Sequence, residues 1–519
     1  MPREMDYIHR FLKCVIFGPI GMTKTHKDYS VDEIRIENLR SLKDTGYIKL
    51  KRINIFLGQN SSGKSTFVRT LPLLKQSLQE RTKSGILWYG KYVDFGSFKE
   101  ATCNLSDTDK NTIDFTFVID NLEVKDEHVF LPTKTQIKNP QAIKPGRVEI
   151  TAMVSKDSQR LSKFRLTIKN YVMSFSVADN VVLKEFDIDG IDYLAKANFG
   201  YTFYLHYGLL PLLFPQQPGE APILAEDLLR ELLKELDGES SIDSLLISEL
   251  TFQRCSDKAT LAQYLKISED KINDTILMLA GHYVLTKSIP YIWDSLRDQV
   301  NRFTANVQYV TPIRASAERY YRIQGLSVEE LDPQGANLAM FLHSLSTHDA
   351  KDFSDWIQKN MGFSVTAKST EGHASILISD KNNKKINMAD TGFGYSQVIP
   401  ILAQIWKAKT ADRRSDPICY VLEQPELHLH PKMQARLADV LISAIQEDKK
   451  SRIQLIIETH SETFINQLGK AIDNKALKSS DVGIYLFDKG DSDGITHITE
   501  STFDDKGFLT KWPYGFFDS

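Results

Sequence analysis

The chain has 519 residues, a formal net charge of −3, 42% hydrophobic residues and 25% charged residues. A chain of this length and composition can bury a large core without disulfides or metal ions. The charge excludes a protein that binds nucleic acid through overall positive charge, although a local basic groove stays open. The four cysteines are dispersed and match no zinc-ligand spacing, and no apolar segment is as long as a membrane span. We therefore expect a reduced, cytoplasmic protein with no membrane contact.

The first half of the chain predicts a β-rich lobe after an N-terminal extension of residues 1–30. Short apolar or alternating runs predict strands, at 34–36, 47–50 and 53–57. Segments between about 86 and 203 alternate and are rich in Val, Ile, Phe and Thr, as antiparallel strands are. The apolar segment 204–215 predicts a buried helix that ends at Pro215. Residues 31–215 thus form the first predicted lobe.

The second half predicts a helical insert and then an α/β lobe. Residues 216–300 change to helical periodicity, and 260–276 fit either a helix-turn-helix or two ordinary packed helices. Residues 301–519 alternate apolar strands with helices, which is typical of a mostly parallel sheet with crossover helices. The predicted fold class is α/β, with a mixed sheet, an antiparallel β lobe and an inserted helical subdomain.

The strongest motif is a phosphate-binding loop between a predicted strand and a predicted helix. It matches G-x-x-x-x-G-K-[ST] at every fixed position, and it comprises Gly58, Gln59, Asn60, Ser61, Ser62, Gly63, Lys64, Ser65 and Thr66. The glycines let backbone N–H groups face phosphate oxygens. Lys64 would reach the β- and γ-phosphates, and Ser65 would present its hydroxyl to Mg²⁺. The sequence therefore predicts ATP and Mg²⁺ as cofactors.

A second motif follows the apolar strand 418–422, which ends in the carboxylate Glu423. A carboxylate at this position would hold Mg²⁺ opposite Ser65. The next residue, Gln424, can orient a water molecule but cannot accept its proton. His428 and His430 lack a third metal ligand, and we expect them in a turn that contacts a second subunit.

Two weaker motifs flank this strand. His460 follows the apolar strand 453–457, 37 residues after Glu423, and is a candidate contact to the γ-phosphate. Gly392, Gly394 and Ser396 precede an apolar helix, where N–H groups and a hydroxyl would form an anion site. Each string by itself also fits a structural role, such as a capped glycine turn.

In this order the four motifs resemble those of ABC-type ATPases related to the SMC, RecF and OLD proteins. The chain is most similar to the ATPases of Septu and retron-associated anti-phage systems (PtuA-like), through LLKQSL, YVDFGSF, EQPELHLHP and the terminal WP-GFFD pattern. The resemblance implies an ABC-type ATPase head in which the 392–396 segment contacts ATP held by a second subunit. It also implies Gln424 at the position of a catalytic glutamate, so ATP hydrolysis is in doubt.

The resemblance implies a nucleotide-gated scaffold in a homodimer or higher homo-oligomer that controls a separate HNH-type nuclease. Reverse transcriptase with its noncoding RNA, or DNA, stays open as a further partner. The alternative is an SMC/RecF-like DNA-repair ATPase that clamps DNA by hydrolysing ATP. A nuclease site in this chain is disfavoured, because Asp488, Asp491 and Asp493 fit a hairpin turn better than a metal cluster.

Overall fold

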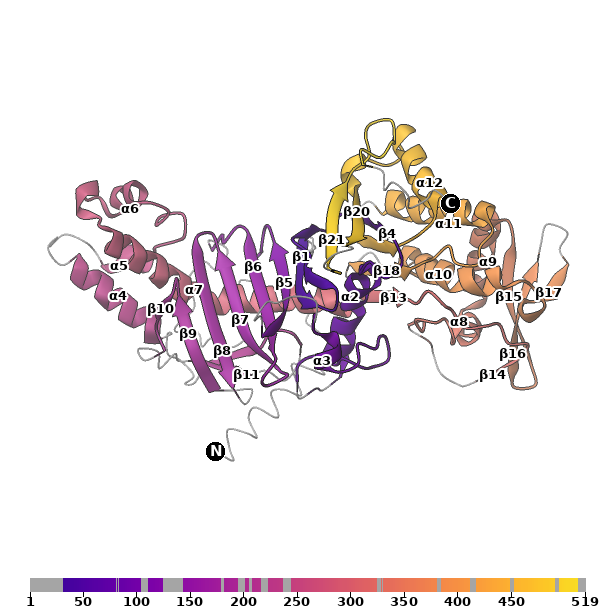
Figure 1. Cartoon of the computed structure of the whole chain (residues 1–519), viewed down its shortest axis with the longest axis horizontal. Helices are drawn as coiled ribbons and strands as arrows, with labels where there is room; N and C mark the ends of the chain where they lie inside the picture. The colour runs from indigo at the N-terminus through magenta and orange to yellow at the C-terminus, as the bar shows by residue number, and fades with distance from the viewer. Residues whose placement is uncertain are drawn as a thin grey trace, which may run out of the picture.

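The computed structural model describes residues 31–80, 82, 84–103, 111–124, 143–178, 182–194, 201–204, 208–215, 223–236, 244–323, 328, 330–379, 384–410, 417–448, 452–490 and 494–511. These residues form an elongated molecule with an antiparallel sheet toward one end and the α/β lobe toward the other (Figure 1). The N-terminal extension and the terminal WP-GFFD pattern lie outside the described residues, as do Asp491 and Asp493.

A nine-stranded antiparallel sheet makes up the first lobe, in the order β10-β9-β8-β7-β6-β5-β1-β2, with β3 also paired to β1. Its strands are β1 (Glu33–Leu39), β2 (Leu42–Asp44), β3 (Ile48–Lys49), β5 (Thr112–Ile119), β6 (Val148–Ser155), β7 (Leu161–Ile168), β8 (Tyr171–Ala178), β9 (Val182–Ile188) and β10 (Ile191–Asp192). In β7 buried and exposed side chains alternate, as expected where one face covers a core.

A six-stranded sheet forms the centre of the second lobe, in the order β13-β18-β19-β4-β20-β21. Its strands are β4 (Ile53–Gly58), β13 (Val307–Val310), β18 (Ile418–Glu423), β19 (Ile453–Glu458), β20 (Val482–Lys489) and β21 (Thr496–Ser501). The first five strands are parallel and only β21 is antiparallel. Every residue of β4 is buried, because this central strand is covered on both faces.

Helices join and cover the sheets. Those of the first lobe and the insert are α2 (Lys64–Gln79), α3 (Phe98–Ala101), α4 (Ile223–Glu235), α5 (Ser244–Ser248), α6 (Lys258–Leu265) and α7 (Asp274–Ala305). Those of the second lobe are α8 (Leu338–Ser344), α9 (Thr347–Met361), α10 (Phe393–Thr410), α11 (Pro431–Glu447) and α12 (Glu462–Asp473). The 32-residue α7 spans about 48 Å and leads from the insert back to β13 (Figure 1).

Two hydrophobic cores meet at the strand that precedes the phosphate-binding loop. Phe56 belongs to the core shared by the antiparallel sheet, α2 and the insert. Ile55 and Leu57 belong to the core shared with α8 to α12. Phe56 also stacks on Phe67 of α2, with ring centroids 5.1 Å apart. Both faces of β4 are therefore fixed by packing, which holds the loop after it in place.

The predicted fold class is confirmed, but the prediction for residues 204–215 is wrong. There the described residues form a two-stranded antiparallel hairpin of β11 (Tyr201–Tyr204) and β12 (Leu212–Pro215), not a helix. A smaller sheet in the second lobe contains β14 (Tyr321–Arg322), β15 (Ser364–Thr370), β16 (His373–Ser379) and β17 (Lys385–Asn387). Across the described ranges, no helix combines the length and apolar character that crossing a membrane requires.

Candidate nucleotide site

The loop between β4 and α2 needs glycine at its two ends. Gly58 has φ +149°, and a Cβ there would overlap the carbonyl oxygen of Phe487 on β20. Gly63 has φ +98° and lies against Thr496 and Ser41, so a side chain would have to displace both. Ser61, between them, also adopts a positive φ of 62°. The sequence folds into a tight curl here because the two glycines allow backbone angles that most other residues disfavour.

Lys64, the first residue of α2, is 2% exposed. Its Nζ donates to the carbonyl oxygens of Gly58 at 2.8 Å and Gln59 at 2.7 Å, both within the loop itself. Burial lowers the pKa of Lys64, while the charge of Glu458 opposes this shift. The ammonium is thus held over the loop, where phosphate oxygens could replace these neutral acceptors with charged ones.

Two carboxylates end neighbouring parallel strands beside this loop. Glu423 on β18 and Glu458 on β19 occupy the same register, and each is 2% exposed. Ser65 Oγ donates to Glu458 Oε1 at 2.8 Å. Burial, and then the nearby charge of Glu423, raise the pKa of Glu458 to about 7. The Ser65 hydroxyl is therefore bonded to Glu458, and the motifs predicted Glu423 as the carboxylate opposite it.

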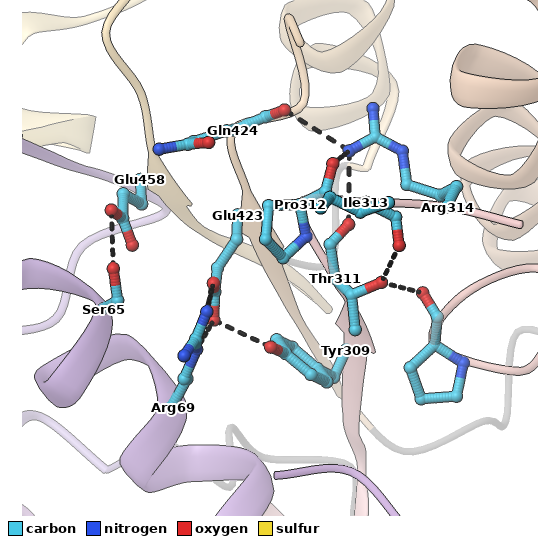
Figure 2. Close-up of polar contacts among 11 residues, drawn as sticks. Ser65, Arg69, Tyr309, Thr311, Pro312, Ile313, Arg314, Glu423, Gln424 and Glu458 are labelled. Carbon is cyan, nitrogen blue, oxygen red and sulfur yellow. Dashed lines mark hydrogen bonds and ion pairs between the residues drawn. The ribbon is translucent and has the colours of Figure 1, made fainter. Parts of the chain in front are cut away.

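Glu423 instead contacts two residues that the motif analysis did not identify (Figure 2). Arg69 on α2 donates Nε to Oε1 at 2.9 Å and Nη2 to Oε2 at 2.8 Å. The hydroxyl of Tyr309 on β13 donates to Oε1 at 2.8 Å. The ion pair raises the pKa of Arg69, and burial together with the charge of Glu423 raises that of Tyr309. Glu423 is thus the anion of a buried ion pair.

Gln424 and His460 lie at the same edge of the sheet. Gln424 has a left-handed φ of 43°, and its backbone N–H donates to the carbonyl oxygen of Glu458 at 2.8 Å. The backbone N–H of His460 donates to Glu426 Oε1 at 2.7 Å. Burial, and then the charge of Lys64, lower the pKa of His460 to about 4. The imidazole is therefore neutral at pH 7, and Lys64 is close enough to affect it.

The predicted anion-binding segment begins α10. Gly392 is exposed, and a Cβ built there meets nothing within 4 Å. Gly394 lies against the turn after β18, near the carbonyl oxygen of His428. Ser396 is 4% exposed, and its hydroxyl donates to the carbonyl oxygen of Phe393 within the same helix. The accessible part of this segment is therefore Gly392 with Phe393, and the Ser396 hydroxyl is directed inward.

Arg314 connects this segment to the turn after β18, although the sequence analysis gave it no role. It is 2% exposed, and its guanidinium donates to the carbonyl oxygens of Gln397 on α10 at 3.1 Å and of Pro425 at 3.2 Å. It also donates to the carbonyl oxygen of Gln424 at 3.3 Å (Figure 2). Burial lowers its pKa to about 10, against the opposing effect of Glu426. One side chain thus ties together two predicted motifs.

Of the residues that the motifs missed, Glu458 and Arg69 had signals in the sequence. Glu458 ends its apolar strand just as Glu423 ends the preceding one. Arg69 is four residues after Ser65 and so lies on the same face of α2. The contacts of Tyr309 and Arg314 depend on how β13 and α10 pack.

The described residues contain no group of three or more His, Cys, Asp or Glu side chains that could hold a metal ion. This does not conflict with a magnesium nucleotide, because Mg²⁺ is commonly bound by one or two protein groups together with substrate phosphates and water. The Ser65 hydroxyl with a strand-end carboxylate beside the loop is such a set, and together with Lys64 it fits Mg²⁺ with ATP.

Comparison with known proteins gives an extensive match to a protein family. The model of a family described as "AAA ATPase domain" matches residues 30–465. No curated protein sequence matches the chain. Among solved structures, the chain is similar to the SMC head domain of Pyrococcus furiosus bound to the C-terminal domain of ScpA, with 11% identity over 91% of this chain and 96% of that one and a TM-score of 0.34. The SMC head domain of Thermotoga maritima has 7% identity, coverages of 90% and 97%, and a TM-score of 0.34.

Proposed function

Because the chain belongs to the AAA ATPase domain family, we propose that it binds ATP with Mg²⁺ at loop 58–66 and acts as a nucleotide-gated scaffold in anti-phage defence. In this proposal ATP pairs two copies of the chain, and the pair controls a separate HNH-type nuclease in the cytoplasm. Lys64 binds the β- and γ-phosphates, and Ser65 contacts Mg²⁺ beside the strand-end carboxylates. Membership of an ATPase family implies nucleotide binding, and the remaining steps are our proposal.

The observation that carries ATP binding is the set of contacts around Lys64. The buried Lys64 ammonium donates to the carbonyl oxygens of Gly58 and Gln59 and to the hydroxyl of Ser62, and it forms no ion pair with any of the described residues. Glu458 lies near enough to influence its pKa. Phosphate oxygens at this position would gain charge-assisted hydrogen bonds from Lys64 and from N–H groups at the start of α2.

Slow turnover is supported by the residue that follows Glu423. Gln424 occupies the turn where the resembling ATPases have a glutamate, and an amide cannot accept a proton from water at neutral pH. The nearby Glu426 is buried, and its Oε1 accepts the backbone N–H of His460, so it is engaged in holding the turn. A site of this kind suits a protein that stays loaded with ATP.

Pairing of two copies is supported by exposed apolar side chains near the site. Phe393, at the start of α10, is 65% exposed, and its ring lies 6.3 Å from that of His428. Ile313 is 71% exposed and adjoins Arg314, whose guanidinium is bonded to α10. Apolar residues gathered beside a polar site are typical of a surface that a partner covers.

A partner nuclease is supported by the sequence resemblance and by the helical insert. Helices α4 to α6 lie at the end of the molecule farthest from the second lobe (Figure 1). A nucleotide site does not require them, and they offer a separate surface for a partner. We therefore assign nuclease control to this insert and ATP sensing to the second lobe.

The test has two parts. The purified chain with ATP and either Mg²⁺ or Mn²⁺ should leave plasmid DNA and RNA intact, and its ATP turnover should be slow. When the chain and an HNH nuclease encoded beside its gene are expressed together, phage protection should require both. Cleavage of nucleic acid by the purified chain alone would contradict the scaffold role. Rapid DNA-stimulated ATP turnover would favour the DNA-clamping ATPase instead.

A further inference from the structure

The order of the strands places two carboxylates at different distances from the phosphate-binding loop. β19 is hydrogen-bonded directly to β4, the strand that leads into the loop. β18 lies one strand farther away, and neighbouring strands are about 4.8 Å apart. Glu458 ends β19 and Glu423 ends β18 in the same register. Topology alone therefore brings Glu458 closer to the start of α2.

Glu458 is directed at the hydroxyl that the loop motif assigns to the metal ion. Ser65 Oγ lies 2.8 Å from Glu458 Oε1. The other oxygen, Oε2, is buried and has no hydrogen-bond partner within the described part of the chain. The side chain is 2% exposed, so the free oxygen has no access to bulk water. A buried carboxylate oxygen without a partner is costly, and a cation between it and Ser65 would relieve that cost.

Glu423 differs from Glu458 because both of its carboxylate oxygens accept hydrogen bonds. Its Oε1 accepts from Arg69 Nε and from the Tyr309 hydroxyl, and its Oε2 accepts from Arg69 Nη2. Both oxygens are therefore occupied by donors. The Arg69 guanidinium carries a fixed positive charge beside the carboxylate and would repel a divalent cation there. To bind Mg²⁺ directly, Glu423 would have to break a buried ion pair.

We propose that Glu458, and not Glu423, is the carboxylate that holds Mg²⁺ together with Ser65, and that Glu423 is the counter-ion that fixes Arg69 on α2. The inference deepens the proposed function and rests on its ATP site. Ser65 can donate its proton to Glu458 while an oxygen lone pair faces the metal ion. The remaining ligands would come from phosphate oxygens and water.

The test compares Glu458→Gln with Glu423→Gln, two substitutions of nearly unchanged shape. Binding of a fluorescent ATP analogue is measured in Mg²⁺ and in EDTA for each protein. The wild-type chain should bind more tightly in Mg²⁺. Glu458→Gln should reduce this Mg²⁺-dependent gain about 10- to 100-fold and keep the binding seen in EDTA. Glu423→Gln should keep the gain, and the electron paramagnetic resonance spectrum of Mn²⁺ with nucleotide should change only in Glu458→Gln.

The outcomes separate this inference from the function on which it rests. A wild-type chain that binds no nucleotide contradicts the proposed function. The assignment to Glu458 is overturned if only Glu423→Gln loses the Mg²⁺-dependent gain in affinity. It is also overturned if both variants lose this gain or if both keep it. Thermal unfolding checks that each variant is folded. If Glu458→Gln does not fold, Glu458→Asp replaces it, because aspartate keeps the charge on a shorter side chain. A Glu458→Asp protein with the full wild-type gain in affinity and the wild-type Mn²⁺ spectrum would also count against the assignment.

Discussion

Arg69 on α2 and Glu423 on β18 form a two-point ion pair, with Nε 2.9 Å from Oε1 and Nη2 2.8 Å from Oε2. The pair links the helix after the phosphate-binding loop to the strand that carries the second motif, 354 residues later. It makes Glu423 part of the scaffold of the site and leaves the edge of the sheet nearest the loop to Glu458.

The ion pair predicts that Arg69→Ala destabilises the fold. The substitution leaves Glu423 buried with Tyr309 as its remaining side-chain donor. Arg69 is 34% exposed at its side chain, so we expect a loss of about 2 kcal/mol in the free energy of unfolding, below the cost of breaking a fully buried pair. Urea unfolding measures this loss of stability. Adding Glu423→Gln to Arg69→Ala should recover part of the lost stability. If the losses in unfolding free energy from the two substitutions simply add, the two residues are not coupled.

Arg314→Lys should lower stability by about 3 kcal/mol, because one ammonium cannot replace a buried guanidinium that donates to several carbonyl oxygens. The matched control is Arg319→Lys, since Arg319 forms an exposed ion pair with Asp390 and should cost less than about 0.5 kcal/mol. Denaturant unfolding compares the two. Equal stability of both variants would show that Arg314 does not hold α10 to the turn after β18.

Gly392→Arg should block ATP-dependent pairing of two copies and leave ATP binding to one copy intact. Position 392 is exposed and a side chain there meets nothing within 4 Å, so the single chain tolerates the change. Ser396→Arg is a weaker test because Ser396 is buried. Analytical ultracentrifugation with and without ATP measures pairing, with Ser158→Arg, in the exposed turn between β6 and β7, as the control. Normal pairing by Gly392→Arg would remove this segment from the interface.

Gln424→Glu should increase ATP turnover. A carboxylate can act as a general base where the amide cannot, and such assistance is worth roughly 10²- to 10⁴-fold. Measuring phosphate release by the wild type and by Gln424→Glu gives the difference in ATP turnover. Lys64→Ala gives the background rate. A fast wild-type rate that does not change with the residue at 424 would show that another group activates the water.

The local motifs of the site could be predicted because their residues are adjacent in the sequence. Gly58, Gly63 and Lys64 belong to one loop whose backbone angles glycine permits. The pairing of Ser65 with Glu458 could not be predicted in this way, because it depends on β19 lying between β18 and β4. Strand order is a property of the whole sheet, and a motif does not encode it.

The wrong prediction for residues 204–215 has an equally specific cause. The segment 204–215 is a short apolar run, and periodicity alone does not distinguish a buried helix from a buried strand in such a run. Its pairing with residues 201–204 decided the outcome. The contact of Ser396 with ATP held by a second subunit stays a prediction, and in the single chain its hydroxyl donates to the carbonyl oxygen of Phe393. The rotation of a helix about its axis depends on packing against α9 and α11.

The central claim is that loop 58–66 binds ATP through Lys64, and isothermal titration calorimetry of the wild type and Lys64→Ala with ATP and Mg²⁺ tests it most directly. Removing the ammonium deletes a charge-assisted contact to the phosphates, so the account predicts wild-type binding and a loss of about 100-fold in Lys64→Ala. Circular dichroism confirms that the variant is folded. Equal affinity of two folded proteins for ATP would contradict the account.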